Sequence, residues 1–433
     1  MAEIEKRISK DGKITFRIKV FKWKDVNGKK ITESTTFTPT KKTPKAMEKE
    51  VQEFAREYEK KVKEEKILSG EKLTLIDVVE EWKQDQAYKD LTKAVQESYV
   101  DILERRIFPH IGNLKIAKIT SLHIQKIYNT MEAEGKAPTT IKRTNAVLRS
   151  VMKYACRVRI IHENPCGTDW IRLPKIKADT DLHYFTLDQA NRFLNSLSEE
   201  YTIEHPEVIR KNGRKIPAYT ETITTPFQYV PFFYLAIYGG FRRGEILALT
   251  WNDIDFKNRT VSITKAITKT KEGQFVKETK TVAGNREIML PSQCFEVLKE
   301  WKLKQMELAF SMGKSWKGEP GKNFDNNFIF IQLENGLRMD VDTPTHKFKK
   351  AIENYNSACT KEEDKLPLIH LHELRHTSAT LLLANNVDIE TVSHRLGHSK
   401  PSITLDVYGH WMKETDKTAS DTLENLFNKK SAI

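Results

Sequence analysis

Apolar and basic side chains alternate near the start of the chain, which predicts a small β-sheet. Residues 14–20 carry an apolar side chain at every second position, with Arg17 and Lys19 on the opposite face of the strand. A return strand is expected at 31–37, and a helix from Pro44 to about residue 66. The first 66 residues are therefore expected to form a small domain of sheet plus helix.

From residue 73 to 170 the apolar positions recur every three or four residues, which predicts an all-α domain. The expected helices are 74–87, 92–107, 120–134 and 138–159. In the last of these, Lys142, Arg143 and Arg149 point away from the apolar positions. Such a face can contact the phosphates of a DNA duplex, although an ordinary solvated face has the same pattern.

After about residue 180 helical and strand-like segments mix, which predicts a third, mainly helical domain with a small antiparallel sheet. Residues 200–226 are interpreted as an irregular surface excursion with no assigned role. Helical structure is expected at 231–249, interrupted by Gly239-Gly240, and at 291–308 and 344–355, and strands are expected at 259–268, 285–290 and 328–331. The chain as a whole is predicted to be a multidomain protein.

The charge of the chain favours nucleic acid as its partner. There are 72 Lys and Arg against 59 Asp and Glu, a formal net charge of +13, and residues 1–45 hold 13 basic against 5 acidic residues. Because Arg17 and Lys19 line one sheet face and Lys22 follows in the same basic segment, we expect all three to contact DNA. The alternatives are solvated lysine faces, and a hairpin that packs on the next domain.

The cysteines and the hydropathy of the chain suggest an intracellular protein without membrane association. The four cysteines contain no CxxC pair, so free thiols in a reducing compartment are expected. The N-terminus lacks an apolar signal segment. The longest apolar run is shorter than the ~20 residues that span a bilayer.

The chemistry-bearing residues concentrate between Leu371 and Tyr408. His372, Arg375 and His376 stand at i, i+3 and i+4 and share one helical face. Cations at a helix N-terminus suit a phosphate, and Tyr408 supplies a phenolic oxygen nearby in the sequence. This combination predicts covalent attack on a phosphodiester.

Arg242 lies in an apolar helical segment, where a cation is costly unless it is paired or functional. Glu245, three residues later, is the expected partner. A purely structural ion pair is the alternative reading of this motif.

Taken together, these motifs make the chain resemble the tyrosine recombinase family, which includes the integrases of phages and conjugative transposons. The resemblance covers about 170 residues of the third domain and rests on motifs in the family's order: Gly-Phe-Arg242-Arg-Gly-Glu245, Thr-Lys280-Thr before Arg286-Glu-Ile, His372-Glu-Leu-Arg375-His376, Leu-Gly-His398 and Tyr408. The resemblance implies the tyrosine recombinase fold and a site-specific recombinase that integrates or excises a mobile element.

The resemblance also implies a role for each motif residue. Tyr408 would attack DNA and form a 3′-phosphotyrosine, with Arg242 and Arg375 holding the phosphate. His398 would donate to the same phosphate, His372 would act as base or phosphate ligand, and Lys280 would protonate the leaving 5′ hydroxyl. Glu245 would orient an arginine, and His376 would be a structural hydrogen-bonding histidine.

By the same resemblance, residues 1–66 would bind arm sites, 73–170 core sites, and 180–433 would form the catalytic domain with a C-terminal tail. The enzyme would need no cofactor and no metal. Its partners would be double-stranded DNA and further copies of itself in a tetramer, with an excisionase and a host DNA-bending protein as possible helpers. It would act in the bacterial cytoplasm, at the nucleoid. The tail after Trp411 would dock on a neighbouring protomer or pack on its own domain.

Three alternatives remain at this stage. His372-Glu373-Leu-Arg-His376 also satisfies the HExxH pattern of zinc peptidases, but Arg375 would place a cation beside the metal and no third ligand is evident. A type IB topoisomerase uses the same phosphotyrosine chemistry without strand exchange. A DNA-binding protein derived from a recombinase would keep the fold and lose the reaction.

Overall fold

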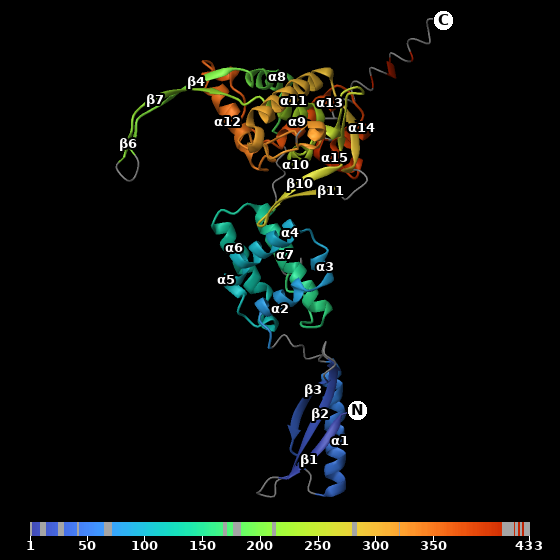
Figure 1. The fold of residues 1–433 in the computed structure, drawn as a ribbon. Coiled ribbons are helices and arrows are strands. Elements are labelled where there is room, and N and C mark those ends of the chain that lie inside the picture. The colour runs from blue at the N-terminus through green and yellow to red at the C-terminus, as the bar shows by residue number, and fades with distance from the viewer. Residues whose placement is uncertain are drawn as a thin grey trace. The chain divides into compact units, whose positions relative to one another are not determined.

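The computed structural model (Figure 1) describes residues 2–8, 14–24, 30–40, 43–64, 72–167, 171–175, 183–209, 214–278, 284–319 and 321–408, together with 420, 423–424 and 427. By its internal contacts the chain divides into two units, Met1–Lys177 and Ala178–Ile433. Lys280 and most of the C-terminal tail lie outside the described residues. No helix among the described residues is long and apolar enough to cross a membrane.

The first unit begins with a three-stranded antiparallel sheet in the order β1-β2-β3. The strands are β1 Glu3–Ile8, β2 Ile14–Lys24 and β3 Lys30–Phe37, and helix α1 Pro44–Glu64 follows. Ile18 and Val20 are buried while Arg17 and Lys19 stay partly exposed, so the predicted apolar and basic faces are confirmed. Strand β1 was not predicted, because its sequence, EIEKRI, carries charge at most positions.

The rest of this unit is helical, as predicted. Its elements are α2 Leu75–Lys83, α3 Gln86–Lys89, α4 Lys93–Ile102, a π-helical turn Leu103–Ile107, α5 Phe108–Ile111, α6 Ser121–Ala133 and α7 Pro138–Arg157. They share one core, in which Leu103, Leu148 and Val151 are completely buried. Arg143 and Arg149 lie on the exposed face of α7.

The second unit is built around helix α9, Tyr229–Gly239, which is apolar on all sides and almost wholly buried. Helices α8 Leu187–Ser196, α11 Ser292–Met312, α12 Thr343–Ala358 and α13 Glu373–Ala384 surround the same core, with α10 Arg243–Ala248 after α9. A small antiparallel sheet has the order β12-β9-β8, from Arg286–Met289, Thr260–Ile263 and Ile254–Asp255. The predicted mixed, mainly helical domain is thus observed.

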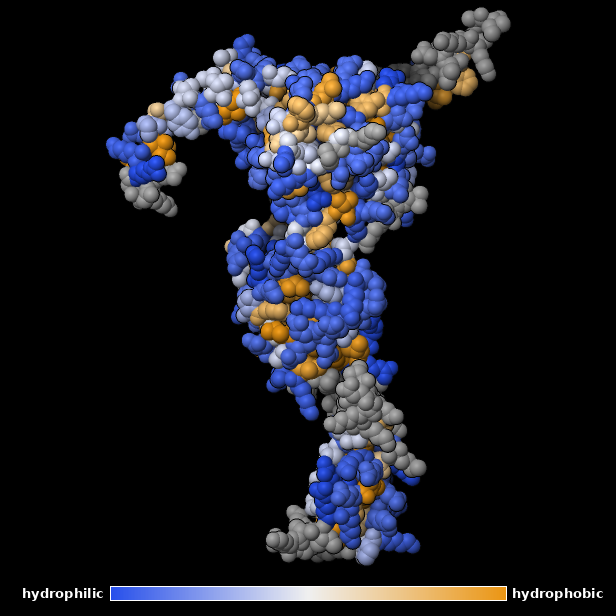
Figure 2. All heavy atoms as spheres, viewed as in Figure 1, coloured by the Kyte–Doolittle hydropathy of each residue, from blue (hydrophilic) through white to orange (hydrophobic). Residues whose placement is uncertain are grey.

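Residues 200–226 are not irregular, and that interpretation was wrong. Strands β4 Glu200–His205 and β7 Tyr219–Thr224 pair over six residues, and β5 Val208–Ile209 pairs with β6 Lys215–Ile216. The ribbon extends away from the core of the second unit (Figure 1) and carries exposed apolar residues (Figure 2), among them Val208 and Ile209. Since both faces are largely exposed, the apolar alternation that marks a half-buried strand is missing. The strand expected at 328–331 is reduced to isolated bridges.

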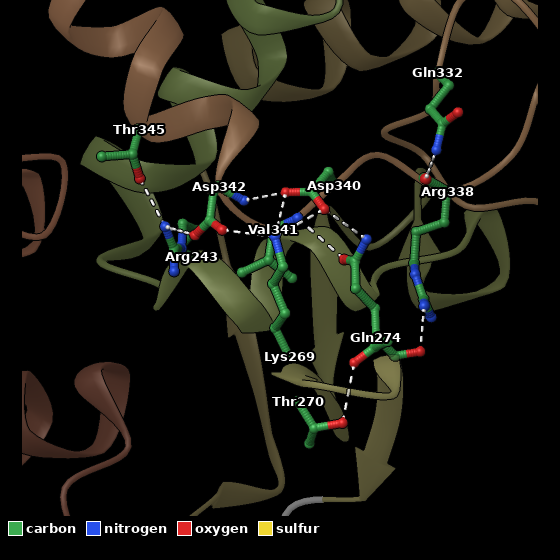
Figure 3. A network of polar contacts seen from close by, with 11 residues as sticks. Arg243, Lys269, Thr270, Gln274, Gln332, Arg338, Asp340, Val341, Asp342 and Thr345 are labelled. Atoms are coloured by element: carbon green, nitrogen blue, oxygen red, sulfur yellow. Dashed lines mark hydrogen bonds and ion pairs between the residues drawn. The ribbon is translucent and has the colours of Figure 1, made fainter. Parts of the chain in front are cut away.

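A second ribbon, β10 Lys265–Thr270 with β11 Gly273–Glu278, precedes Lys280 in the sequence and is tied to the loop before α12 (Figure 3). The Lys269 ammonium donates to Asp342 at 2.8 Å and to Asp340 at 3.2 Å. Gln274 donates to Asp340 and accepts from the amide of Val341. The loop therefore holds both strands of the ribbon.

Candidate active site

Tyr408 ends helix α15, Pro401–Tyr408, and its ring closes a small core between three helices. Ala379 of α13, and Val392 and Leu396 of α14, Ile389–Leu396, complete that core. Tyr408 is 1% exposed, and burial raises the pKa of its hydroxyl to about 12, although Arg375 acts in the opposite direction. The packing of the ring fixes where the phenolic oxygen lies.

The hydroxyl of Tyr408 lies 2.6 Å from Nδ1 of His376. Burial, followed by the neighbouring His372 and Arg375, lowers the pKa of His376 to about 4. The ring is therefore neutral near pH 7, and its Nδ1 can accept the hydrogen bond that the phenol donates. Sequence reasoning gave His376 only a structural role, yet its ring contacts the predicted nucleophile.

Each of the two predicted clamp arginines is held by a backbone carbonyl of a different motif. Arg375 Nη1 donates to the carbonyl of Gly240 at 2.8 Å, and Arg242 Nη2 donates to the carbonyl of Gly397 at 3.3 Å. Gly240 has φ +62°, and a Cβ there would meet a Leu396 methyl at 2.8 Å. Both the positive φ and this contact favour glycine at 240, whose carbonyl accepts from Arg375. These bonds bring segments near 240, 375 and 397 into one site.

Arg375 keeps one donor free for a ligand. The residue is 3% exposed, and its Nη2 is buried without a hydrogen-bond partner among the described residues. Burial and the charge of Arg242 lower the pKa of Arg375 to about 9. A buried, unsatisfied guanidinium beside a second arginine is costly, and an anionic phosphate would satisfy it.

Glu245 is buried between two arginines. Its carboxylate accepts from Arg242 Nη1 at 2.8 Å and from Arg286 Nη2 at 2.7 Å, so the predicted Arg242–Glu245 pair is confirmed. Burial alone would raise the pKa of Glu245, but its bonds to Arg286 and the charge of that residue outweigh burial and lower the pKa. Glu245 therefore stays ionised and orients Arg242.

Two further histidines lie close to this cluster. His398 Nδ1 is 2.8 Å from the hydroxyl of Thr404, and burial together with Arg375 and Arg242 lowers its pKa to about 4. His372 occupies the N-cap position of α13 without a side-chain capping bond, and partial burial, Arg375 and Arg242 lower its pKa as well. The arginine charges thus act on both rings, as they would on a bound phosphate.

The structure brings together most of the residues that the sequence singled out. These contacts and the electrostatic effects of the two arginines join seven residues into one cluster: Arg242, Glu245, His372, Arg375, His376, His398 and Tyr408. Lys280, and the side chain of Lys22, lie outside what the structure describes. Among the other residues expected to contact DNA, Arg17 donates to Ser34, and Arg143 donates to Ser98. The Lys19 ammonium lies 3.9 Å from the Glu3 carboxylate, the Lys142 side chain is half-buried, and Arg149 is exposed.

Sequence reasoning missed the role of Arg286. Its side chain is 1% exposed and its Nε donates to the carbonyl of Arg395. The signal was available, because Arg286 shares the buried face of β12 with Ile288. A charged residue on such a face needs a partner, and Glu245, which the sequence had paired with Arg242 alone, supplies it.

The contacts of the HExxH motif do not suit a metal. His376 is engaged with Tyr408, and a carboxylate oxygen of Glu373 accepts the backbone N–H of His370. Among the described residues, no group of three or more His, Cys, Asp or Glu is arranged to hold a metal ion.

Comparison with known proteins gives a consistent result. Residues 209–415 match the phage integrase family, and residues 76–170 match the phage integrase central domain. A protein described as tyrosine recombinase XerC-like, from Caldanaerobacter subterraneus subsp. tengcongensis, is 26% identical over 431 residues, covering 96% of this chain and 98% of the relative.

Solved structures show the same fold. The Tn1549 transposon integrase, in complex with a circular intermediate DNA, has a TM-score of 0.61 at 18% identity and covers 81% of this chain and 99% of that chain. A lambda integrase tetramer bound to a Holliday junction has a TM-score of 0.50 at 17% identity, with coverage of 92% and 96%.

Proposed function

The chain belongs to the tyrosine recombinase family and is a site-specific DNA recombinase, and we propose that it cuts and rejoins DNA through a covalent link to Tyr408. The observation that best supports this is Nη2 of Arg375, which has no hydrogen-bond partner among the described residues and would donate to an oxygen of the scissile phosphate. The charge of Arg375 opposes the rise in the pKa of the Tyr408 hydroxyl, so the anion site and the phenol belong to one centre.

In the proposed reaction the Tyr408 oxygen attacks the scissile phosphorus and displaces the 5′ oxygen of the next nucleotide. Negative charge builds on the non-bridging oxygens, and the positively charged forks of Arg242 and Arg375 stabilise it. His372 and His398 would donate to the same oxygens. The leaving 5′ oxygen takes a proton, for which Lys280 is the proposed donor.

The product would be a 3′-phosphotyrosine with a free 5′ hydroxyl. Because the phosphotyrosine keeps the energy of the broken bond, the 5′ hydroxyl of a partner strand can attack it and reverse the step. This explains why the reaction would need neither a nucleotide nor a metal ion.

The other domains would supply DNA recognition. Residues 73–170 would bind core sites through the basic face of α7, with Lys142, Arg143 and Arg149 on phosphates. Residues 1–66 would bind arm sites through Arg17, Lys19 and Lys22, and 180–433 would form the catalytic domain.

By analogy with the lambda integrase tetramer on a Holliday junction, four copies would exchange strands. An excisionase and a host DNA-bending protein would set direction, and the reaction would take place at the bacterial nucleoid.

The proposal is tested with a nicked DNA substrate that traps the covalent complex, run on a denaturing gel with EDTA present. Wild-type protein should form an adduct, and Tyr408→Phe should bind the same DNA without forming one. Loss of the wild-type adduct in EDTA would instead favour metal chemistry, and an adduct in Tyr408→Phe would place the nucleophile elsewhere.

A further inference from the structure

The hydrogen bond between His376 and Tyr408 has a consequence for the reaction itself. The two rings lie 5.6 Å apart between centroids, and the phenolic oxygen and Nδ1 are 2.6 Å apart. Within the part of the chain that the structure describes, Tyr408 makes no other side-chain hydrogen bond. His376 is therefore placed where the phenolic proton points.

His372 is less well placed for that proton. It stands at the N-cap of α13, exposed to solvent, with its ring edge-on to His376 at 5.6 Å. The charges of Arg375 and Arg242 both lower the pKa of His372. This position suits contact with phosphate oxygens rather than with the phenol.

We propose that His376 is the general base that takes the proton from Tyr408 during DNA cleavage, an inference that rests on the proposed function. As the bond between the Tyr408 oxygen and phosphorus forms, the phenolic proton moves to His376 Nδ1. The bond from phosphorus to the 5′ oxygen breaks, and that oxygen is protonated by the acid assigned to Lys280. On rejoining, the imidazolium of His376 returns the proton to Tyr408 as the phosphotyrosine bond breaks.

Binding of DNA would favour this transfer. Arg375 is one of the cations that disfavour a proton on His376. A phosphate bound to Arg375 brings a negative charge beside that cation and offsets its effect on the imidazole. The base would thus become stronger when the substrate is in place.

The test compares two substitutions at one position. His376→Asn places an amide oxygen near the site of Nδ1, so it can accept the hydrogen bond but cannot carry the proton; His376→Phe removes the acceptor. With DNA saturated by protein, single-turnover cleavage should fall on the order of 100-fold or more in both variants. DNA affinity should change by no more than about threefold, because His376 contacts no phosphate in the proposal.

A matched control and a chemical bypass sharpen the test. His394→Asn changes an exposed histidine on α14 and should cleave at the wild-type rate. A fluorinated tyrosine at position 408 gives a more acidic phenol, which needs less help from a base. It should restore cleavage to His376→Asn more than to Arg375→Lys.

Cleavage by His376→Asn within about threefold of wild type would show that a hydrogen bond suffices, and would overturn the inference. Equal responses of His376→Asn and Arg375→Lys to the fluorinated tyrosine would also overturn it. In both cases a covalent adduct on Tyr408 would leave the proposed function intact. An adduct that persists in Tyr408→Phe would instead refute the proposed function.

Discussion

Arg286 and Glu245 form an ion pair of 2.7 Å whose side chains are 1% and 4% exposed. Glu245 accepts from both guanidinium nitrogens that Arg286 directs at it, and it also accepts the backbone N–H of Arg242. A pair this deep contributes little net stability over an apolar pair, but loss of one partner strands the other charge. The pair joins strand β12 to the N-terminus of α10.

We therefore expect Glu245→Gln to lower the free energy of unfolding of the second unit by about 3–5 kcal/mol. Urea unfolding followed by tryptophan fluorescence measures this change. The control is Asp188→Asn, which removes a surface pair with Arg192 and should cost less than about 1 kcal/mol. Equal losses of stability in the two variants would mean that breaking the buried pair costs no more than breaking a surface pair.

The same pair predicts a dependence on pH. Since the pKa of Glu245 is lowered from its ordinary 4.5 in the folded state, its stabilising effect is complete above that value and is lost as the pH falls through the folded pKa. The stability difference between wild type and Glu245→Gln should therefore be full near pH 7 and shrink well below about pH 4.5. A difference that grows towards acid pH would contradict the lowered pKa.

Arg375→Lys should abolish most cleavage while leaving DNA binding nearly intact. A lysine cannot keep the bond to the Gly240 carbonyl and also fill the position of Nη2. We expect single-turnover cleavage to fall on the order of 100- to 1000-fold.

Arg243→Lys is the matched control for this change. Arg243 donates to Asp342 and Thr345 (Figure 3), neither of which belongs to the cluster around Tyr408. Its cleavage rate should stay within about tenfold of wild type. A larger loss of cleavage in Arg243→Lys than in Arg375→Lys would show that the phosphate had been assigned to the wrong arginine.

Gly240→Ala should reduce both stability and cleavage. The positive φ costs an alanine about 1 kcal/mol or more, and the added methyl would displace Leu396 and the carbonyl that holds Arg375. Gly135→Ala separates these causes, because Gly135 has φ +73° with open space around it. It should lose stability to a similar strain but cleave at the wild-type rate.

The basic face of α7 predicts salt-dependent binding. Arg143→Gln and Arg149→Gln should each weaken DNA binding at low salt and reduce the slope of log affinity against log salt by about one. Arg157→Gln is the control, because that guanidinium is already paired with Asp85. Slopes unchanged in the first two variants would remove α7 from the DNA interface.

The sequence was most informative where periodicity or a local motif determined the structure. The helices of residues 73–170 follow from their apolar spacing, and the Arg242–Glu245 pair follows from the three-residue spacing between the N-cap and the first turn of α10. Both depend on contacts between residues close in the chain.

Contacts between distant segments could not be predicted in this way. The Arg375–Gly240 bond spans 135 residues and the bond between His376 and Tyr408 spans 32. No feature of the neighbouring sequence tells whether a histidine at position 376 is structural or touches the nucleophile. The ribbon of β4 and β7 was missed for a related reason, since a pair of strands exposed on both faces has no apolar alternation.

The most direct test of the account is the identification of the residue that carries the DNA. Wild-type protein is trapped on a nicked substrate and digested, and the peptide bearing a nucleotide is sequenced by mass spectrometry. The account predicts a 3′-phosphate linked to Tyr408, with no such peptide from Tyr408→Phe. A nucleotide on any other residue, or one attached through a 5′-phosphate, would contradict it.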